Sequence, residues 1–317
     1  MQNKLKIVVL DRDTLGEGVN LDILTKAGET VIYGRTSYDE LGERISDCDV
    51  IIVNKTRLNK ETLNGAGKLK LICVTATGFD NIDTEYCKSK NIAVCNVKGY
   101  STDSVAQVTA AMVLSLTVNL FKYRDIVNSG EYTKSGLANA LSPLFHEIYG
   151  KTWGIIGYGN IGKRVGEIAK AMGCRVIYTK NTPDEKSCDI DYLCRNSDII
   201  TIHTPLTDKT KKLIDKEKLS IMKDGVILVN VARGAVTDEK AVTDAVKSGK
   251  IGGLGVDVYS AEPMSETHPF NEITGRYNVC LTPHMAWGAV EARQRCIDEI
   301  YENIKSFVSS GSRNRIV

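Results

Sequence analysis

The chain has 317 residues, of which 42% are hydrophobic and 25% charged, and its formal net charge is +2. This length suits two domains of ordinary size. The small net charge argues against nucleic acid or an anionic membrane as the main partner. The longest apolar segment, residues 105–121, is interrupted by polar side chains such as Gln107 and Asn119. It therefore predicts a buried helix and no membrane span.

The nine cysteines are scattered, without a C-x-x-C pair or a neighbouring cluster of histidines. Reduced thiols that behave as small hydrophobic side chains are typical of cytoplasmic proteins. We therefore expect a cytoplasmic protein without a metal site. The N-terminal apolar run, residues 7–10, leads directly into charged residues, which indicates a strand and not a signal peptide.

Before residue 100, short β-like runs alternate with helical stretches, which predicts a parallel sheet with helices on both faces. The runs are residues 5–10, 30–33, 50–53, 69–74 and 92–95. No glycine fingerprint follows the first run, so we do not expect the cofactor site here. A long helix is expected from about Ser104 to Arg124. Because it is apolar on more than one face, it suits either a homodimer seam or a helix buried within its own domain.

The second half repeats the alternation with the strand count of a full dinucleotide-binding sheet. Its runs are residues 152–156, 175–179, 199–203, 226–230, 253–258 and 279–282. A final helical stretch, residues 288–308, has no place in that sheet, and we expect it to pack on the first domain. The predicted domains, both doubly wound α/β parallel sheets, are therefore residues 1–99 with 285–317 and residues 100–284. The chain would cross between them twice and form a hinge beside a cleft.

A glycine-rich turn follows the run that ends at residue 156. It reads Gly157, Tyr158, Gly159, Asn160, Ile161, Gly162 and leads into a helical pattern. Strand, turn and helix in this order are the context of a dinucleotide-binding fingerprint. The first glycine allows a tight turn, the second lets the backbone approach a pyrophosphate, and the third lets helix and strand pack closely. The helix N-terminus would then bind the pyrophosphate.

Three later segments carry reactive side chains at the ends of predicted strands. They are residues 230–234 (Asn-Val-Ala-Arg-Gly), 255–263 (Gly-Val-Asp-Val-Tyr-Ser-Ala-Glu-Pro) and 281–287 (Leu-Thr-Pro-His-Met-Ala-Trp). Ligands bind at the carboxyl ends of strands in a doubly wound sheet, so we expect all three segments to meet at one crevice.

Together with the glycine turn, these segments resemble the D-2-hydroxyacid dehydrogenase family in their order and spacing. The likeness includes residues 73–83 (Cys-Val-Thr-Ala-Thr-Gly-Phe-Asp-Asn-Ile-Asp) and so covers nearly the whole chain. The resemblance implies a Rossmann cofactor domain inserted into a flavodoxin-like substrate domain. It also implies a homodimer that uses NAD(P)H to reduce a small 2-oxo acid, reversibly, to a D-2-hydroxy acid.

The resemblance makes His284, Glu262 and Arg233 the catalytic residues. An imidazole titrates near neutral pH, so His284 can give a proton to the substrate oxygen and take it back. Glu262 would hydrogen-bond the ring, orient it and favour its charged form. Arg233 offers planar donors that match a carboxylate and polarise the carbonyl.

The resemblance also assigns binding residues. Asp257 would hold the nicotinamide carboxamide, and His203 would line the adenine side of the cofactor site. Besides the six residues of the glycine turn, the expected cofactor-binding residues are Lys180, His203, Thr204, Pro205, Val231, Ala232, Asp257 and Ala286. The expected substrate-binding residues are Asn54, Ala76, Thr77, Gly78, Arg233 and His284. His146 and His268 are interpreted as surface or loop histidines.

One position departs from the common pattern. An NAD-binding fold usually carries Asp or Glu about 20 residues past the glycines, where it binds the ribose hydroxyls. Here Lys180 stands at that place, and the next carboxylate is Asp184. A lysine could accept a 2′-phosphate, or it could be solvated while NADH still binds. The choice between NADH and NADPH therefore stays open at this point.

The polar residues Asn54 and Lys55 of the first half would suit a hydroxylated substrate such as hydroxypyruvate or glyoxylate. Residues 100–107 and Trp287 resemble the glycerate dehydrogenase (hydroxypyruvate reductase) branch, although Trp287 could equally pack at the hinge. Alternatives are a D-lactate or 2-hydroxyisocaproate type of dehydrogenase, and an NAD(H)-sensing, corepressor-like binding protein on the same fold. A formate dehydrogenase would carry glutamine where this chain has Glu262.

Overall fold

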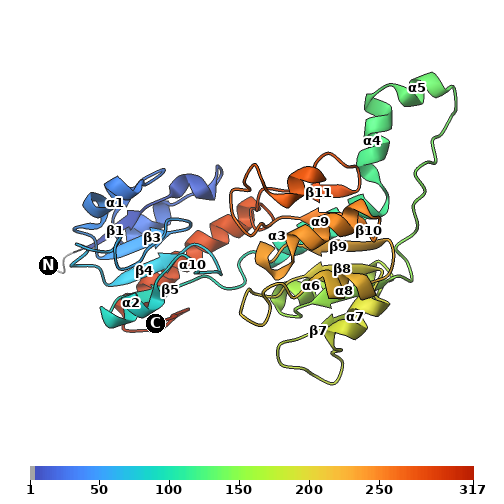
Figure 1. The fold of residues 1–317 in the computed structure, drawn as a ribbon. Helices are drawn as coiled ribbons and strands as arrows, with labels where there is room; N and C mark the ends of the chain where they lie inside the picture. Colours follow the sequence, from blue (N-terminus) through green and yellow to red (C-terminus); the bar gives the residue numbers. More distant parts are fainter. Residues whose placement is uncertain (1–3) are drawn as a thin grey trace. The chain divides into compact units, whose positions relative to one another are not determined.

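The computed structural model describes residues 4–317 (Figure 1). The chain forms two compact units. Unit 1 ends at Ser101 and resumes at Gly288, and unit 2 spans Thr102–Trp287. These divisions lie near the expected boundaries at 99/100 and 284/285. Residues 1–3, which belong to the predicted first domain, lie outside the described residues.

Unit 1 contains a parallel sheet with the strand order β2-β1-β3-β4-β5. This is the order of flavodoxin-like doubly wound sheets, so the predicted fold class is confirmed for this unit. Every residue of β3 and β4 is buried, as expected where helices cover both faces of a parallel sheet. The strands are β1 (Leu5–Val9), β2 (Gly28–Ile32), β3 (Val50–Val53), β4 (Leu71–Val74) and β5 (Ala93–Cys95). The helices are η1 (Arg12–Leu15), η2 (Asp22–Lys26), α1 (Tyr38–Ile45), α2 (Thr84–Ser89) and α10 (Val290–Val308), the last of which packs on β4.

Unit 2 contains a six-stranded parallel sheet with the order β11-β10-β9-β8-β6-β7. All six predicted strands are present. They are β6 (Thr152–Ile156), β7 (Arg175–Thr179), β8 (Ile199–Ile202), β9 (Val226–Asn230), β10 (Ile251–Val256) and β11 (Val279–Leu281). The chain runs from β6 to β7 on one side and then to β8 on the other side of β6. This reversal is a topological switch point, where open α/β sheets bind ligands.

Two helical layers bury the sheet of unit 2 (Figure 1). On one face α3 and α6 pack over Trp153 and Ile155, and on the other face α7, α8 and α9 pack over Ile156 and Ile200. Because both faces are buried, the strands are continuously apolar, which made them easy to predict. The helices are α3 (Thr102–Thr117), α4 (Leu120–Asn128), α5 (Glu131–Ser135), α6 (Asn160–Ala171), α7 (Ile190–Asn196), α8 (Lys216–Ile221) and α9 (Glu239–Lys247), with the 3-10 turns η3 (Gly234–Val236) and η4 (Pro269–Glu272).

The prediction of one long helix from Ser104 to Arg124 was wrong. The segment forms α3 and α4, which are bent by 63° relative to one another. Asn119 lies at the break with a φ of +53°, a left-handed conformation that asparagine tolerates better than most residues. Its side-chain amide donates a hydrogen bond to the Leu144 carbonyl at 3.0 Å, a contact from 25 residues away that the local sequence does not reveal.

No single helix in the described part of the chain is long and apolar enough to cross a membrane, and α3 and α4 meet the length and composition criteria only as a bent pair. The nine cysteines are free thiols. Burial raises the pKa of Cys48 and of Cys194 to about 12, so these thiols stay protonated and act as small hydrophobic side chains. Within residues 4–317 there is no group of three or more His, Cys, Asp or Glu side chains that could hold a metal ion.

Candidate active site

The glycine turn joins β6 to α6, and its glycines are required for different reasons. A Cβ on Gly157, whose φ is +92°, would lie 2.8 Å from the backbone of His203 and Thr204. A Cβ on Gly162 would lie 2.2 Å from the Gly157 carbonyl oxygen. A Cβ on Gly159 would meet no described atom within 4 Å, and α6 begins without a side-chain cap. Gly159 thus opens the uncapped helix N-terminus to an anion such as a pyrophosphate.

Tyr158 ties the glycine turn to the neighbouring strand. Its ring stacks on that of Tyr178 in β7, with centroids 3.8 Å apart and planes 8° apart. The amides of Gly157 and Tyr158 both donate to the Thr179 carbonyl, at 3.2 and 3.1 Å. These two amides are engaged within the protein, so phosphate binding would fall to the first turn of α6.

The end of β7 carries an ion pair that the sequence did not predict. Lys180 Nζ lies 2.9 Å from Asp184 Oδ2, and the Tyr178 hydroxyl donates to Asp184 Oδ1 at 2.9 Å. The hydrogen bonds from Lys180 and Tyr178 lower the pKa of Asp184 to about 2. The position expected for the ribose-binding acid therefore holds a lysine whose charge is balanced by a carboxylate four residues later.

His203 follows β8 at the switch point. Both of its ring nitrogens are buried and have no hydrogen-bond partner among the described residues. Burial lowers the pKa of His203 to about 3, so the ring is neutral near pH 7. A neutral, unpartnered imidazole next to the glycine turn suits the wall of a ligand site and not an acid–base role.

Arg233 follows β9, where Asn230 shapes the chain. The Asn230 side chain accepts a hydrogen bond from the Ala232 amide and donates one to the Arg233 carbonyl, both at 3.0 Å. Such a turn is a common use of asparagine at the end of a strand. A Cβ on the next residue, Gly234, would lie 2.1 Å from the backbone of Tyr259. The segment that carries Arg233 is therefore in direct backbone contact with the loop after β10.

Glu262 and His284 lie on the loops after β10 and β11. His284 Nδ1 is 2.6 Å from Glu262 Oε2, and the other oxygen of Glu262 accepts a hydrogen bond from the Tyr259 amide at 3.1 Å. His284 has a φ of +52°, and residues in this region are often found at functional sites. Because Nδ1 is held by the carboxylate, proton exchange with a substrate would use Nε2.

Asp257 organises the loop that carries His284. The carboxylate, which is 1% exposed, accepts hydrogen bonds from the Thr282 hydroxyl at 2.5 Å and from the amides of Met285 and Ala286 at 2.8 and 2.9 Å. The resemblance assigned Asp257 only to the cofactor, and Asp257 also holds the Thr282 side chain before His284 and the two backbone amides after it.

His268 lies in a loop, as expected, where it caps η4, but it does not lie at the surface. It is 6% exposed, and its Nε2 lies 3.0 Å from Glu239 Oε2. Glu239 lies 29 residues earlier in the chain, at the start of α9, so the local sequence around His268 does not predict the pair. His146, by contrast, is exposed as expected.

Comparison with known proteins places this arrangement in a family. Residues 110–286 match the NAD binding domain of the D-isomer specific 2-hydroxyacid dehydrogenases. The chain is 34% identical to the hydroxypyruvate reductase of Blautia hydrogenotrophica over 98% of this chain and 99% of that protein. The chain belongs to the D-2-hydroxyacid dehydrogenase family.

Solved structures match the chain over nearly its whole length. The D-lactate dehydrogenase from Aquifex aeolicus, complexed with NAD and lactic acid, has a TM-score of 0.83 and 31% identity over 98% of this chain and 99% of that chain. An acyclic imino acid reductase (Bsp5), in complex with NADPH and D-Arg, has a TM-score of 0.85 and 30% identity over 99% of this chain and 100% of that chain.

As a D-2-hydroxyacid dehydrogenase, the chain is an oxidoreductase that acts on a CH–OH group with a nicotinamide cofactor. The residues of unit 2 fit that cofactor. The open space at Gly159 and the uncapped α6 suit its pyrophosphate, and the backbone of His203, a residue with two unpartnered ring nitrogens, lies beside the same turn.

The remaining candidates lie in unit 1, at the carboxyl ends of neighbouring strands. Asn54 follows β3, and residues 76–78 follow β4. The buried carboxylate of Asp11 accepts hydrogen bonds from the amides of Asn54, Lys55 and Thr56 at 2.9, 2.7 and 2.9 Å. It therefore fixes the conformation of the Asn54 loop, a role for Asp11 that the sequence did not indicate.

Proposed function

We propose that this dehydrogenase reduces a small 2-oxo acid of the hydroxypyruvate or glyoxylate kind to the D-2-hydroxy acid, with Arg233, Glu262 and His284 as catalytic residues. The 2.6 Å contact between Glu262 and His284 carries the proposal. A histidine that is oriented by a carboxylate and held on a strained backbone is suited to acid–base catalysis.

Each catalytic residue has a distinct task. When bound, the nicotinamide cofactor would supply the hydride for the substrate carbon. His284 gives a proton from Nε2 to the carbonyl oxygen, and in the reverse direction it takes that proton back. Glu262 holds Nδ1 and so fixes the orientation of the ring. The Arg233 guanidinium binds the substrate carboxylate and polarises the carbonyl.

The proposed cofactor-binding residues lie on the glycine turn, at the switch point and on the loops of unit 2. We assign the cofactor to Gly157, Tyr158, Gly159, Asn160, Ile161, Gly162, Lys180, His203, Thr204, Pro205, Val231, Ala232, Asp257 and Ala286. We assign the substrate, besides Arg233 and His284, to Asn54, Ala76, Thr77 and Gly78. The Asp257 carboxylate already accepts three hydrogen bonds, so its role in cofactor binding is combined with support of the His284 loop.

The substrate proposal is supported by the polar loop at Asn54 and Lys55 and by the likeness to a hydroxypyruvate reductase. Reduction of hydroxypyruvate, glyoxylate, pyruvate and branched or aromatic 2-oxo acids is followed through the absorbance of NADH and NADPH. We expect the highest kcat/KM with hydroxypyruvate or glyoxylate. A higher value with pyruvate would favour a D-lactate type of enzyme. Cofactor binding without turnover of any acid would favour a sensor protein instead.

We also propose that NADH is the preferred cofactor, because Asp184 balances the charge of Lys180 and would repel a 2′-phosphate. Asp184→Asn is then expected to raise the ratio of kcat/KM for NADPH to that for NADH about 5-fold, the effect of about 1 kcal/mol between charges near water. Lys180→Ala is expected to lower that ratio. Lys216→Ala, at an exposed position on α8, removes the same charge elsewhere and serves as the control. An unchanged ratio in Asp184→Asn would contradict the proposal.

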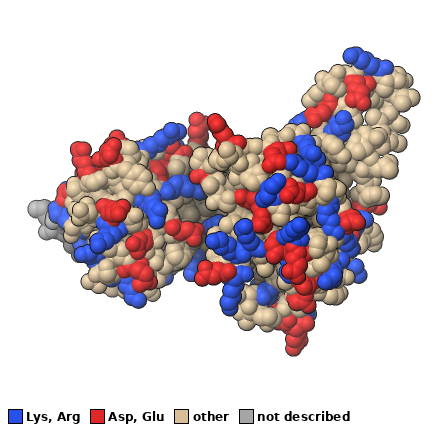
Figure 2. Space-filling view, in the orientation of Figure 1, with Lys and Arg blue, Asp and Glu red and all other residues tan. Residues whose placement is uncertain are grey.

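We propose further that the enzyme is a homodimer and that α4, α5 and the following loop form its interface. This arm extends from the sheet of unit 2 (Figure 1), and Figure 2 shows Lys, Arg, Asp and Glu side chains on it beside a larger uncharged surface, while residues 136–145 carry no charge. Its exposed apolar side chains, typical of an association surface, include Leu120, Val127, Leu137, Leu144 and Phe145. We expect sedimentation equilibrium to give twice the chain mass of 34.8 kDa, and Leu144→Asp to weaken the dimer. A wild-type monomer would exclude this assembly.

The nine free thiols also support a cytoplasmic location, because reducing compartments keep cysteines unpaired. Fractionation of the source cells tests this, and recovery of the protein from an oxidising compartment would argue against it.

A further inference from the structure

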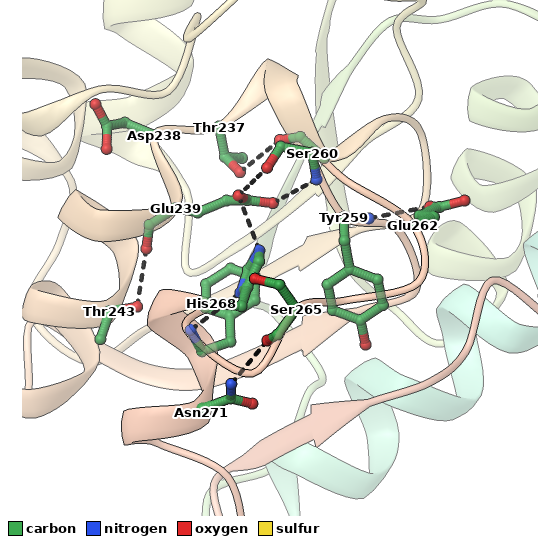
Figure 3. Close-up of polar contacts among 12 residues, drawn as sticks. Thr237, Asp238, Glu239, Thr243, Tyr259, Ser260, Glu262, Ser265, His268 and Asn271 are labelled. Atoms are coloured by element: carbon green, nitrogen blue, oxygen red, sulfur yellow. Dashed lines mark hydrogen bonds and ion pairs between the residues drawn. The ribbon is translucent and has the colours of Figure 1, made fainter.

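Glu239 is a buried carboxylate that the proposed reaction does not use. It is the first residue of α9 and is 8% exposed. Its Oε1 accepts a hydrogen bond from the Ser260 amide at 2.8 Å, and its Oε2 accepts one from the Ser260 hydroxyl at 2.5 Å. His268 Nε2 approaches Oε2 from the other side at 3.0 Å (Figure 3). Three donors from the loop between β10 and η4, two on Ser260 and one on His268, thus converge on one carboxylate.

His268 is oriented so that it can only donate to Glu239. Its Nδ1 accepts a hydrogen bond from the Phe270 amide at 3.2 Å, so the ring proton lies on Nε2. The ring also packs edge-on against Tyr259, with centroids 5.7 Å apart. The N-terminus of α9 adds a favourable field for the carboxylate. The position of Glu239 is therefore set by Ser260, by His268 and by its own place at the start of α9.

The contacts of Glu239 with Ser260 are adjacent to the one that holds Glu262, the proposed catalytic carboxylate. Ser260 follows Tyr259, whose amide donates to Glu262 Oε1 at 3.1 Å and whose hydroxyl donates to the Thr282 carbonyl at 3.0 Å. The two adjacent amides of this short loop are thus held by two carboxylates, Glu239 on one side and Glu262 on the other (Figure 3). A shift of Ser260 would therefore move the donor that holds Glu262 in contact with His284.

The loop has little room to adjust. A Cβ on Gly234 would lie 2.2 Å from the Ser260 amide nitrogen, so the loop already touches the segment that follows Arg233. A buried ionic group is also a poor way to gain stability, since apolar residues of similar volume often serve as well. The Glu239–His268 pair is therefore better explained by the loop geometry that it fixes than by a contribution to the stability of the fold.

We infer that Glu239, held by His268, is a positioning residue that fixes the Tyr259–Ser260 backbone and through it the orientation of Glu262 toward His284. This inference rests on the proposed function for its kinetic test. Glu239→Gln keeps the shape of the side chain and removes its charge, so both contacts with Ser260 weaken while the fold is retained.

The test is a double-mutant cycle in kcat/KM for hydroxypyruvate with NADH. Glu239→Gln is expected to lower kcat/KM about 10-fold in the wild-type background, because small misplacements of catalytic groups have large effects. In the Glu262→Gln background the same change is expected to cost less than about 2-fold, since the group that Glu239 positions is already lost. The KM for NADH should stay unchanged. Equal losses in both backgrounds, or no loss in the first, would overturn the inference.

A second measurement does not depend on the substrate. Amide hydrogen exchange of Tyr259 and Ser260 is expected to be about 10-fold faster in Glu239→Gln than in the wild type. Glu272→Gln, an exposed carboxylate on neighbouring η4, is the matched control and should leave exchange and activity unchanged. Unchanged exchange in Glu239→Gln overturns the inference. A wild type that reduces no 2-oxo acid refutes only the proposed function. Ser260→Ala provides the same readouts if Glu239→Gln does not fold.

Discussion

His284→Ala is expected to lower kcat for 2-oxo acid reduction by about 10²- to 10⁴-fold, the usual contribution of a positioned general acid. The contact between Nδ1 and Glu262 leaves Nε2 as the nitrogen that exchanges the proton, and alanine provides no substitute. Cofactor binding, measured by quenching of protein fluorescence with NADH, should be retained, because the glycine turn and the end of β7 are untouched.

Tyr192→Ala is the control for this variant, since it removes an exposed ring from α7 of the same unit. Its kcat should equal that of the wild type. Near-normal turnover in His284→Ala would remove His284 from the mechanism. A parallel loss of NADH binding would instead mean that the loop held by Asp257 had collapsed.

Arg233→Ala is expected to raise KM for the 2-oxo acid and to lower kcat, with a combined loss in kcat/KM of about 10²- to 10³-fold. Two charge-assisted hydrogen bonds, each of about 1.5–3 kcal/mol, account for an effect of this size. Both parameters should change, because the guanidinium binds the ground-state carboxylate and also stabilises the charge that develops on the carbonyl oxygen.

Arg233→Lys separates charge from geometry. A lysine keeps the charge but lacks the planar pair of donors, so it should recover only part of the lost kcat/KM. Arg195→Ala, at an exposed position on α7, serves as the control for loss of a positive charge. A change in KM alone would restrict Arg233 to substrate binding, and full activity in Arg233→Lys would contradict bidentate recognition.

Much of the fold was predictable because the local hydrophobic pattern of each strand agrees with its burial in the folded sheet. The runs at β6 and β9 are apolar on both faces, since helices cover both sides of a parallel sheet, and they were predicted with the bounds that the structure has. The glycine turn was predictable for a similar reason. At Gly162 the requirement arises from a contact with the Gly157 carbonyl within one strand–turn–helix unit, and at Gly157 it arises from the positive φ of the turn, although Gly157 also lies against the backbone of His203 and Thr204.

Contacts between distant parts of the chain were not predictable. Asn119 bends the helix toward a carbonyl 25 residues later, and His268 pairs with Glu239 from 29 residues earlier. Even the nearby pair of Lys180 and Asp184 depends on how the chain turns after β7. Residue types alone do not reveal which side chains such turns bring together.

The two parallel sheets, the place of the dinucleotide turn and the identity of the residues at the strand ends follow from the sequence, because each depends on local pattern and on the order of elements. The family resemblance implied the contact of Glu262 with His284, whereas the contacts of Asp257 with the His284 loop and of Glu239 with Ser260 are visible only in the folded chain. The physical reason is that a buried carboxylate takes whichever donors the packed loops place within about 3 Å of it, and the distance along the chain does not limit that choice.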